Sequence, residues 1–320
     1  MQIRKDIYRL LKFIVISILI FIGLFFLNSM PLKIEEPAPL TDTLPAIHAP
    51  STMKIFQIPT GSNHRSASFA YRGGSYFDKR EFSMSAVLIQ HPKGDIMIDA
   101  GFGTNAKKHF KSMPLFFKIS TDFDPKSSVA QYFKTIGYNQ DSIKAILLTH
   151  AHWDHVSGIE DFKNTPILVS PNELAFILSN NTLSALARSF NNAKYTTYNF
   201  EQKPYLGFTE SYDYFGDGSV VIVSATGHTS GSVIVFVNLP NGKRYAFIGD
   251  LAWQTEGVEL LREKPFIQSV LGESDRKAVV ENLKKMYAIK KKYPEIELIP
   301  AHDARAYHLI PLFSKDDIIK

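Results

Sequence analysis

The residues whose types and spacing point most clearly to a chemical function lie in the stretch THAHWDH, residues 149–155. It holds His150, His152, Asp154 and His155, although the chain has only 10 histidines in 320 residues. Side chains alternate along an extended strand, so His150 and His152 would point to the same side. If a helix then begins, Asp154 and His155 face the same pocket from its first turn. This convergence of imidazole and carboxylate groups predicts a metal site.

Three more potential ligands occur later in the chain, each directly after an apolar run. His228 lies in ATGHTSGS, Asp250 ends AFIGD and His302 ends LIPAH. Folds that mix helices and strands present their sites at the carboxyl ends of strands, so these residues are expected near the first cluster. The chain has no cysteine, which excludes thiolate ligands, disulfides and a cysteine nucleophile. Any metal site must therefore use histidine and carboxylate ligands.

The spacing HxHxDH at 150–155, followed by His228, Asp250 and His302, resembles the metallo-β-lactamase superfamily over about residues 53–310. The resemblance implies an α+β fold, an αββα four-layer sandwich of two face-to-face sheets with helices on both outer sides. The metals would lie at one edge of this sandwich. The implied ligands are His150, His152 and His228 for the first metal, Asp154, His155 and His302 for the second, and Asp250 bridging both.

Two further aspartates are expected to support the ligands from behind. Asp99 in IMIDAGFG resembles the superfamily's strand-end aspartate, with a simple turn or helix-cap role as the alternative. Asp303 completes the PAHD ending that begins before His302. The glycine-flanked turn around His228 also resembles the superfamily pattern.

The implied cofactor is a pair of divalent metal ions, with Zn²⁺ as the default and iron or manganese suited to the same ligands. Two such ions can share a bridging hydroxide and polarise a substrate oxygen, which predicts a metal-dependent hydrolase. Asp154 and Asp250 are the predicted catalytic residues. Asp154 would pass a proton to the leaving atom, because it is expected to keep one oxygen free towards the pocket.

The predicted substrate is a small lactone or ester. Asp250 weighs against β-lactamase activity, because the β-lactamases of this superfamily generally lack the bridging aspartate. The spacing of His228, Asp250 and His302 is most similar to the acyl-homoserine lactonase branch. Glyoxalase-II-like thioesterase, phosphodiesterase or β-lactamase activity remain alternatives, as does a catalytically silent binding protein on the same fold.

Substrate choice is expected to depend on aromatic residues near the metals. Lactonases of the best-known type carry a tyrosine three residues after the bridging aspartate, where this chain has Trp253. An indole donates one hydrogen bond but cannot pass on a proton, so Trp253 is either a wall of the substrate pocket or a packed aromatic. Phe116 and Phe117 are further wall candidates for an acyl tail. The aromatic residues of the long connection 180–215 form either such a wall or part of the core.

The elements that must position these residues alternate between strands and helices. MKIFQIPTG, FAYRGG, MSAVLIQH and DIMIDAGFG are β-rich runs, with a hairpin turn at HPKG. A helix is predicted over SSVAQYFKTIG and a strand over AILLTH, then a βα unit over TPILVS and PNELAFILS. Three more strands follow, then a long amphipathic helix over residues 274–292 and a last strand ending at His302.

The first thirty residues form a separate unit. They carry four basic residues and Asp6, then the uncharged run Phe13–Leu27, which predicts an N-terminal transmembrane helix, with a cleaved signal as the alternative. Residues 31–52 contain five prolines and predict an extended tether, which leaves 53–320 as the catalytic domain. The basic residues before the apolar run place this domain outside the cytoplasm, in a bacterial periplasm, or secreted if the segment is cleaved.

The charge outside that segment gives no sign of nucleic-acid binding. The formal net charge is +5, of which the first thirty residues supply +3, which leaves +2 for the rest. No basic patch is indicated, so the expected partner is a small-molecule substrate.

Overall fold

The computed structural model describes residues 2–113, 118, 123–191 and 193–318. Its larger sheet has seven strands in the order β4-β1-β2-β3-β5-β6-β7. Strands β3, β5, β6 and β7 run parallel to one another, and the other pairs are antiparallel. The strand bounds are β1 Lys54–Ser66, β2 Lys79–Gln90, β3 Asp95–Ile98, β4 Asp124–Pro125, β5 Ile143–Leu147, β6 Pro166–Val169 and β7 Lys194–Thr197.

The smaller sheet has five strands in the order β12-β11-β10-β9-β8. Only β11 and β12 pair in parallel; the remaining neighbours are antiparallel. The bounds are β8 Ser211–Asp213, β9 Val220–Ser224, β10 Val233–Asn238, β11 Arg244–Gly249 and β12 Ile296–Pro300.

Alternation along the strands explains how the two sheets pack. On β2, Val87 and Ile89 point into a core shared with the smaller sheet, whereas Ala86 and Leu88 point into a second core under the helices of the outer face. The smaller sheet divides its side chains in the same way between the shared core and a third, outer core. A period of two thus gives each sheet two buried faces. The predicted αββα four-layer sandwich is confirmed.

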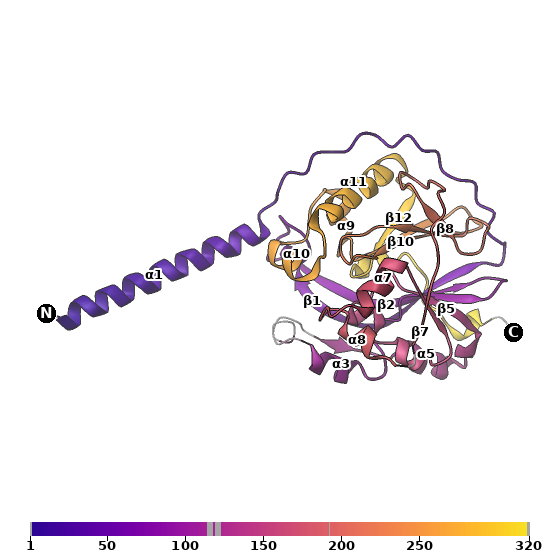
Figure 1. The fold of residues 1–320 in the computed structure, drawn as a ribbon, viewed down its shortest axis with the longest axis horizontal. Coiled ribbons are helices and arrows are strands. Elements are labelled where there is room, and N and C mark those ends of the chain that lie inside the picture. The colour runs from indigo at the N-terminus through magenta and orange to yellow at the C-terminus, as the bar shows by residue number, and fades with distance from the viewer. Residues whose placement is uncertain (1, 114–117, 119–122, 192, 319–320) are drawn as a thin grey trace.

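Helices cover both outer faces, as Figure 1 shows, with α9 and α11 over the smaller sheet and α5 and α8 over the larger one. Their ends follow local signals: Ser128 caps α5 in a capping box with Gln131, and Asp275 accepts bonds from the first turn of α11. The helix bounds are α1 Gln2–Ser29, α2 Ala67–Ala70, α3 Ala106–Ser112, α5 Val129–Ile136, α6 Trp153–Val156, α7 Pro171–Leu178, α8 Ala185–Ser189, α9 Thr255–Glu259, α10 Phe266–Gly272, α11 Arg276–Lys292 and α12 Ala304–Tyr307.

The β-rich prediction for FAYRGG is wrong. This stretch contains the end of helix α2 and the turn after it, not a strand. The reason is that β1 and β2 pair along their whole length, with Ser66 opposite Lys79, so the chain between them has to reverse direction. Gly73 supports the reversal with a positive φ of 85°.

The predicted N-terminal transmembrane helix is also wrong. Helix α1 covers Gln2–Ser29, but none of the described helices combines the length and the apolar character needed to span a bilayer. The uncharged run Phe13–Leu27 extends only about 22 Å at 1.5 Å per residue, against a hydrocarbon core of roughly 30 Å. A membrane partner through this helix is therefore not supported. The predicted compartment and domain boundaries are not tested and stay predictions.

Residues 30–50 contain no helix or strand and run along the outside of the sandwich (Figure 1). The segment is held by contacts to the smaller sheet and its helix layer. Arg244 donates to the carbonyl of Pro45, Tyr293 donates to the carbonyl of Asp42, and Gly207 donates to the carboxylate of Asp42. The predicted extended conformation is present, and the segment lies on the domain surface.

Candidate metal centre

The seven predicted ligands follow four strands that end at the same edge of the sandwich. His150 and His152 come after β5, His228 after β9, Asp250 after β11 and His302 after β12. Strand β5 ends at Leu147, so the two histidines lie on a short extension beyond the sheet rather than within it. His152 then precedes helix α6, whose first turn carries Asp154 and His155.

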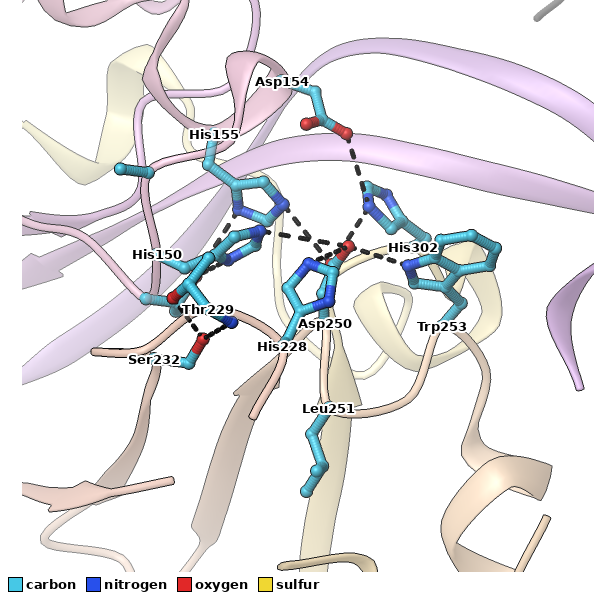
Figure 2. A network of polar contacts seen from close by, with 12 residues as sticks. His150, Asp154, His155, His228, Thr229, Ser232, Asp250, Leu251, Trp253 and His302 are labelled. Atoms are coloured by element: carbon cyan, nitrogen blue, oxygen red, sulfur yellow. Dashed lines mark hydrogen bonds and ion pairs between the residues drawn. The ribbon is translucent and has the colours of Figure 1, made fainter. Parts of the chain in front are cut away.

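These side chains form three overlapping groups, and within each group the potential ligand atoms lie within 4.8 Å of one another. Figure 2 shows the histidine rings turned towards the carboxylate of Asp250. The structure therefore brings together all seven residues that the sequence pattern selected. The groups are His150, His152 and His228; His150, His155 and Asp250; and Asp154, His155 and His302.

Asp250 lies between the two ends of the cluster and presents a different oxygen to each. Its Oδ2 is 3.4 Å from Nε2 of His228, whereas its Oδ1 is 3.4 Å from Nε2 of His155 and 3.1 Å from Nε2 of His302. A single carboxylate is thus placed to serve both groups. Asp154 belongs to the group with His155 and His302, and its Oδ2 is 3.5 Å from Nε2 of His302.

A local irregularity directs Asp250 into the cluster. The register between β11 and β12 shifts between Phe247 and Gly249, and Gly249 has a positive φ of 51°. A bulge of this kind turns the chain and re-aims the next side chain. A Cβ at Gly249 would lie 3.0 Å from Cβ of Thr149, so the glycine also allows the two loops to approach closely.

The donor set fits metal ions. The buried atoms without a hydrogen-bond partner in the described part of the chain include Nε2 of His150, His152, His155 and His228, and Oδ1 of Asp250. A buried polar atom without a hydrogen bond costs about 1–3 kcal/mol, so such a gathering favours a ligand that these atoms can bind. Imidazole nitrogens and carboxylate oxygens are the ligands that zinc and related ions prefer. The arrangement suits two divalent metal ions.

Burial lowers the pKa of each histidine of the first group, which favours the neutral form that binds metals. Burial, together with the neighbouring His155 and His228, holds the pKa of His150 well below its ordinary value. Burial and His228 lower the pKa of His152 in the same way. Burial alone would raise the pKa of Asp250, but His302, His155 and His228 outweigh it and hold that pKa well below its ordinary value.

Asp99 lies behind the cluster and is bonded to one of its histidines. Its Oδ2 accepts a hydrogen bond of 2.7 Å from Nδ1 of His155, which leaves Nε2 of that ring for the cluster. Its Oδ1 accepts from the backbone N–H of Thr149 at 2.7 Å, and Thr149 Oγ1 donates to Oδ2. These bonds hold Asp99 in a left-handed backbone conformation with φ of 55°, which is uncommon outside glycine.

Asp303 acts one step further away. Its carboxylate accepts from the backbone N–H of Thr255 at 3.0 Å and pairs with Arg305 at 2.8 Å. Gln254, next to Thr255, donates to the carbonyl of His302. Asp303 therefore ties the loop after Asp250 to the end of β12.

Two supporting groups have no signal in the sequence. Nδ1 of His302 lies 3.0 Å from the carbonyl of Ser83, which orients the ring so that Nε2 faces Asp250. Buried Lys264 donates to the carbonyls of Asp250 and Leu251. Every residue has a backbone carbonyl, so only the tertiary position of Ser83 relative to the loop after β12 selects this one.

The cluster opens into a cavity of about 140 Å³. The lining includes the predicted ligands His152, Asp154, His228, Asp250 and His302. It also includes apolar residues, some of them directly beside the ligands: Phe69, Phe82, Met84, Trp253, Ile267 and Leu271. A lining that is both polar and apolar suits a molecule with a polar reacting group and an apolar part.

The residues predicted to form a substrate wall lie in different places. Trp253 lines the cavity, whereas Phe116 and Phe117 lie outside the described residues. The aromatic residues between 195 and 214 belong to the packed cores or lie against them, not to this cavity. They fill the margins of the sandwich, where strands β7 and β8 leave apolar side chains to be covered.

Comparisons with known proteins agree with the geometry. The family model of the metallo-beta-lactamase superfamily matches residues 80–302. The N-acyl homoserine lactonase AttM of Rhizobium radiobacter is 22% identical over 237 residues, which cover 71% of this chain and 84% of the relative. A probable metallo-hydrolase of Mycobacterium tuberculosis is 24% identical over 236 residues, 70% of this chain and 75% of that protein.

Two solved structures share the fold. An N-acyl homoserine lactone hydrolase with N-hexanoyl-L-homoserine at its catalytic metal centre superposes with a TM-score of 0.65 at 19% identity, over 81% of this chain and 97% of that one. The dizinc quorum-quenching lactonase AidC superposes with a TM-score of 0.53 at 17% identity, over 87% and 92%. With the family match across the whole ligand pattern, this chain belongs to the metallo-β-lactamase superfamily.

Proposed function

We propose that this chain is a metal-dependent hydrolase that opens lactones bearing an apolar acyl tail, with N-acyl homoserine lactones as the first candidates. The observation that carries the proposal is a single cavity lined both by the predicted metal ligands and by apolar residues. An acyl lactone has the matching division into a polar ring and an apolar chain. The lactonases among the relatives and neighbours support the same substrate class.

We assign His150, His152 and His228 to one metal ion and Asp154, His155 and His302 to the other, with Asp250 shared between them. When bound, two such ions polarise the substrate carbonyl and lower the pKa of water towards neutrality. Asp250 suits the shared position because each of its oxygens faces a different group.

Asp154 suits a role in proton transfer. It is 14% exposed and lines the cavity, whereas Asp250 is 6% exposed and surrounded by histidines. A carboxylate that reaches the cavity can pass a proton to the ring oxygen that leaves when the lactone opens. The apolar residues of the cavity would contact the acyl chain and keep bulk water from it.

The test is a metal and substrate analysis of the full chain. Metal per chain is measured by elemental analysis, and lactones of several acyl lengths, a thioester, a phosphodiester and a β-lactam are assayed before chelation, after chelation and after zinc is restored. We expect two metals per chain and chelator-sensitive lactone hydrolysis as the fastest reaction. Two bound metals without chelator-sensitive lactone hydrolysis would disprove the proposed activity.

A further inference from the structure

A buried glutamate without a positive partner lies behind the first group of histidines. Glu173 is in the first turn of α7 and is 1% exposed. Its carboxylate forms no ion pair within the described part of the chain, and its hydrogen-bond partners there are all uncharged donors. Buried carboxylates are uncommon because desolvation is costly, so this one calls for a structural or functional reason.

The carboxylate of Glu173 joins two loops that are far apart in the sequence. Oε1 accepts from the backbone N–H of Ala151 at 2.6 Å. Oε2 accepts from Oγ1 of Thr229 at 2.5 Å and from the backbone N–H of Gly231 at 3.1 Å. Ala151 lies between His150 and His152, and Thr229 follows His228 directly. One side chain is therefore bonded next to all three histidines of the first group.

The start of α7 is fixed against the second of these loops. Ser170, which caps the helix, accepts from the backbone N–H of Glu173 and donates to the carbonyl of Gly231 at 2.7 Å. A Cβ at Gly231 would lie 1.9 Å from the backbone nitrogen of Glu173, so only glycine permits this approach. The helix end thus gives Glu173 little freedom to move relative to the loop.

We propose that Glu173 is a positioning residue that sets the separation of His150 and His152 from His228, and thereby the affinity of the metal that these three residues hold. The inference rests on the metal assignment of the proposed function. Asp99 is bonded to His155 at the other end of the cluster, so each end has its own supporting carboxylate.

The expected effect follows from the number of donors. Glu173→Gln keeps the size of the side chain but replaces one acceptor oxygen by an NH₂ group, so at least one of the three donors loses its acceptor. Groups that orient metal ligands typically change metal affinity by about 10- to 100-fold when they are mutated. We expect the affinity for the metal assigned to His150, His152 and His228 to fall by that factor. The affinity for the other metal should stay the same.

The experiment is a zinc competition titration with a graded chelator on the full chain, for the wild type and Glu173→Gln. The same change is made in chains that already carry His228→Ala or His302→Ala. The His302→Ala chain should keep the first metal, and there Glu173→Gln should lower the zinc affinity. The His228→Ala chain should keep the second metal, and there Glu173→Gln should leave the zinc affinity unchanged. The visible absorption of the Co²⁺-loaded protein should change as well, since it reports ligand geometry.

Glu263→Gln is the matched control. Glu263 is also buried, at 3% exposed, but it pairs with Arg276 at 2.6 Å rather than with the histidine loops. It should leave both zinc affinities unchanged. Thr229→Val is a milder second variant that keeps Glu173 and removes one donor, and it should weaken the same metal to a smaller extent.

Two results would overturn the inference. One is an unchanged pair of zinc affinities in Glu173→Gln. The other is an equal loss at both metals together with a lower melting temperature of the metal-free protein, which would reveal a general structural role. A wild type that binds fewer than two metals would instead count against the proposed function, so the two failures can be told apart.

Discussion

The indole N–H of Trp253 donates a hydrogen bond of 2.7 Å to Oδ2 of Asp250, the carboxylate at the centre of the histidine cluster (Figure 2). The ring is also stacked on Phe69, with centroids 5.4 Å apart, and Nζ of Lys264 lies 5.6 Å from its centroid. Trp253 therefore combines both roles that its position allowed, since it lines the cavity and is packed. Its one donor is used by Asp250, not by the substrate.

Trp253→Phe should lower the zinc affinity of the site and kcat for lactones by about 10-fold. The change keeps an aromatic ring against Phe69 but removes the donor to Asp250, and a hydrogen bond to a charged group is worth about 1.5–3 kcal/mol. Chelator competition and steady-state kinetics measure both quantities. Phe69→Leu, which alters the stacking and keeps the donor, should change zinc affinity less; an equal loss in both variants would contradict this role.

Asp250→Ala should lower the occupancy of both metals, because its two oxygens face the two histidine groups. Elemental analysis after gel filtration in metal-free buffer measures the occupancy. Asp213→Ala is the control, because that carboxylate accepts bonds from Gly216 and Gly218 in a turn. Retention of one full equivalent of metal in Asp250→Ala would mean that Asp250 belongs to a single site.

Leu271→Gln should raise KM for long-chain acyl lactones several-fold and leave KM for short-chain ones nearly unchanged. Leu271 lines the cavity from α10, and each buried CH₂ contributes about 0.8 kcal/mol. Val270→Gln tests the neighbouring position, which is 60% exposed and does not line the cavity. The same KM change in both variants would place the acyl chain outside this cavity.

Glu256→Gln should destabilise the metal-free protein at pH 7 by about 1–3 kcal/mol, and by progressively less in acid. Burial alone would raise the pKa of Glu256, but bonds from Arg305 and Arg80 outweigh it and lower the pKa to about 2. This folded-state pKa is below the ordinary 4.5, so the stabilisation is complete above pH 4.5 and is lost as the pH falls towards 2. Denaturant unfolding at several pH values measures it.

Glu281→Gln provides the comparison for Glu256. Glu281 pairs with Lys284 on the surface and is 66% exposed, so its removal should change stability by less than about 0.5 kcal/mol at any pH. If Glu256→Gln behaves like Glu281→Gln at pH 7, the ion pairs with Arg80 and Arg305 contribute no net stability.

The ligand cluster could be predicted because its signals are local. His150 and His152 are two residues apart next to a strand, and His228, Asp250 and His302 each follow an apolar strand. The strand-end pattern together with the superfamily resemblance predicts that they converge. The apolar run AVLI, residues 86–89 near the end of β2, likewise indicates a strand segment that is buried on both faces.

The remaining features depend on contacts between segments far apart in the chain. In the sequence, nothing distinguishes Glu173 from any other glutamate in the first turn of a helix. Its role becomes visible only when α7 lies against the loops of Ala151 and Thr229. The direction of the Trp253 N–H follows from the bulge at Gly249 and the stacking on Phe69. Sequence by itself determined the identity of the predicted ligands, because local spacing encodes them; only the tertiary structure decided what holds them in place, because hydrogen-bond partners are selected by packing.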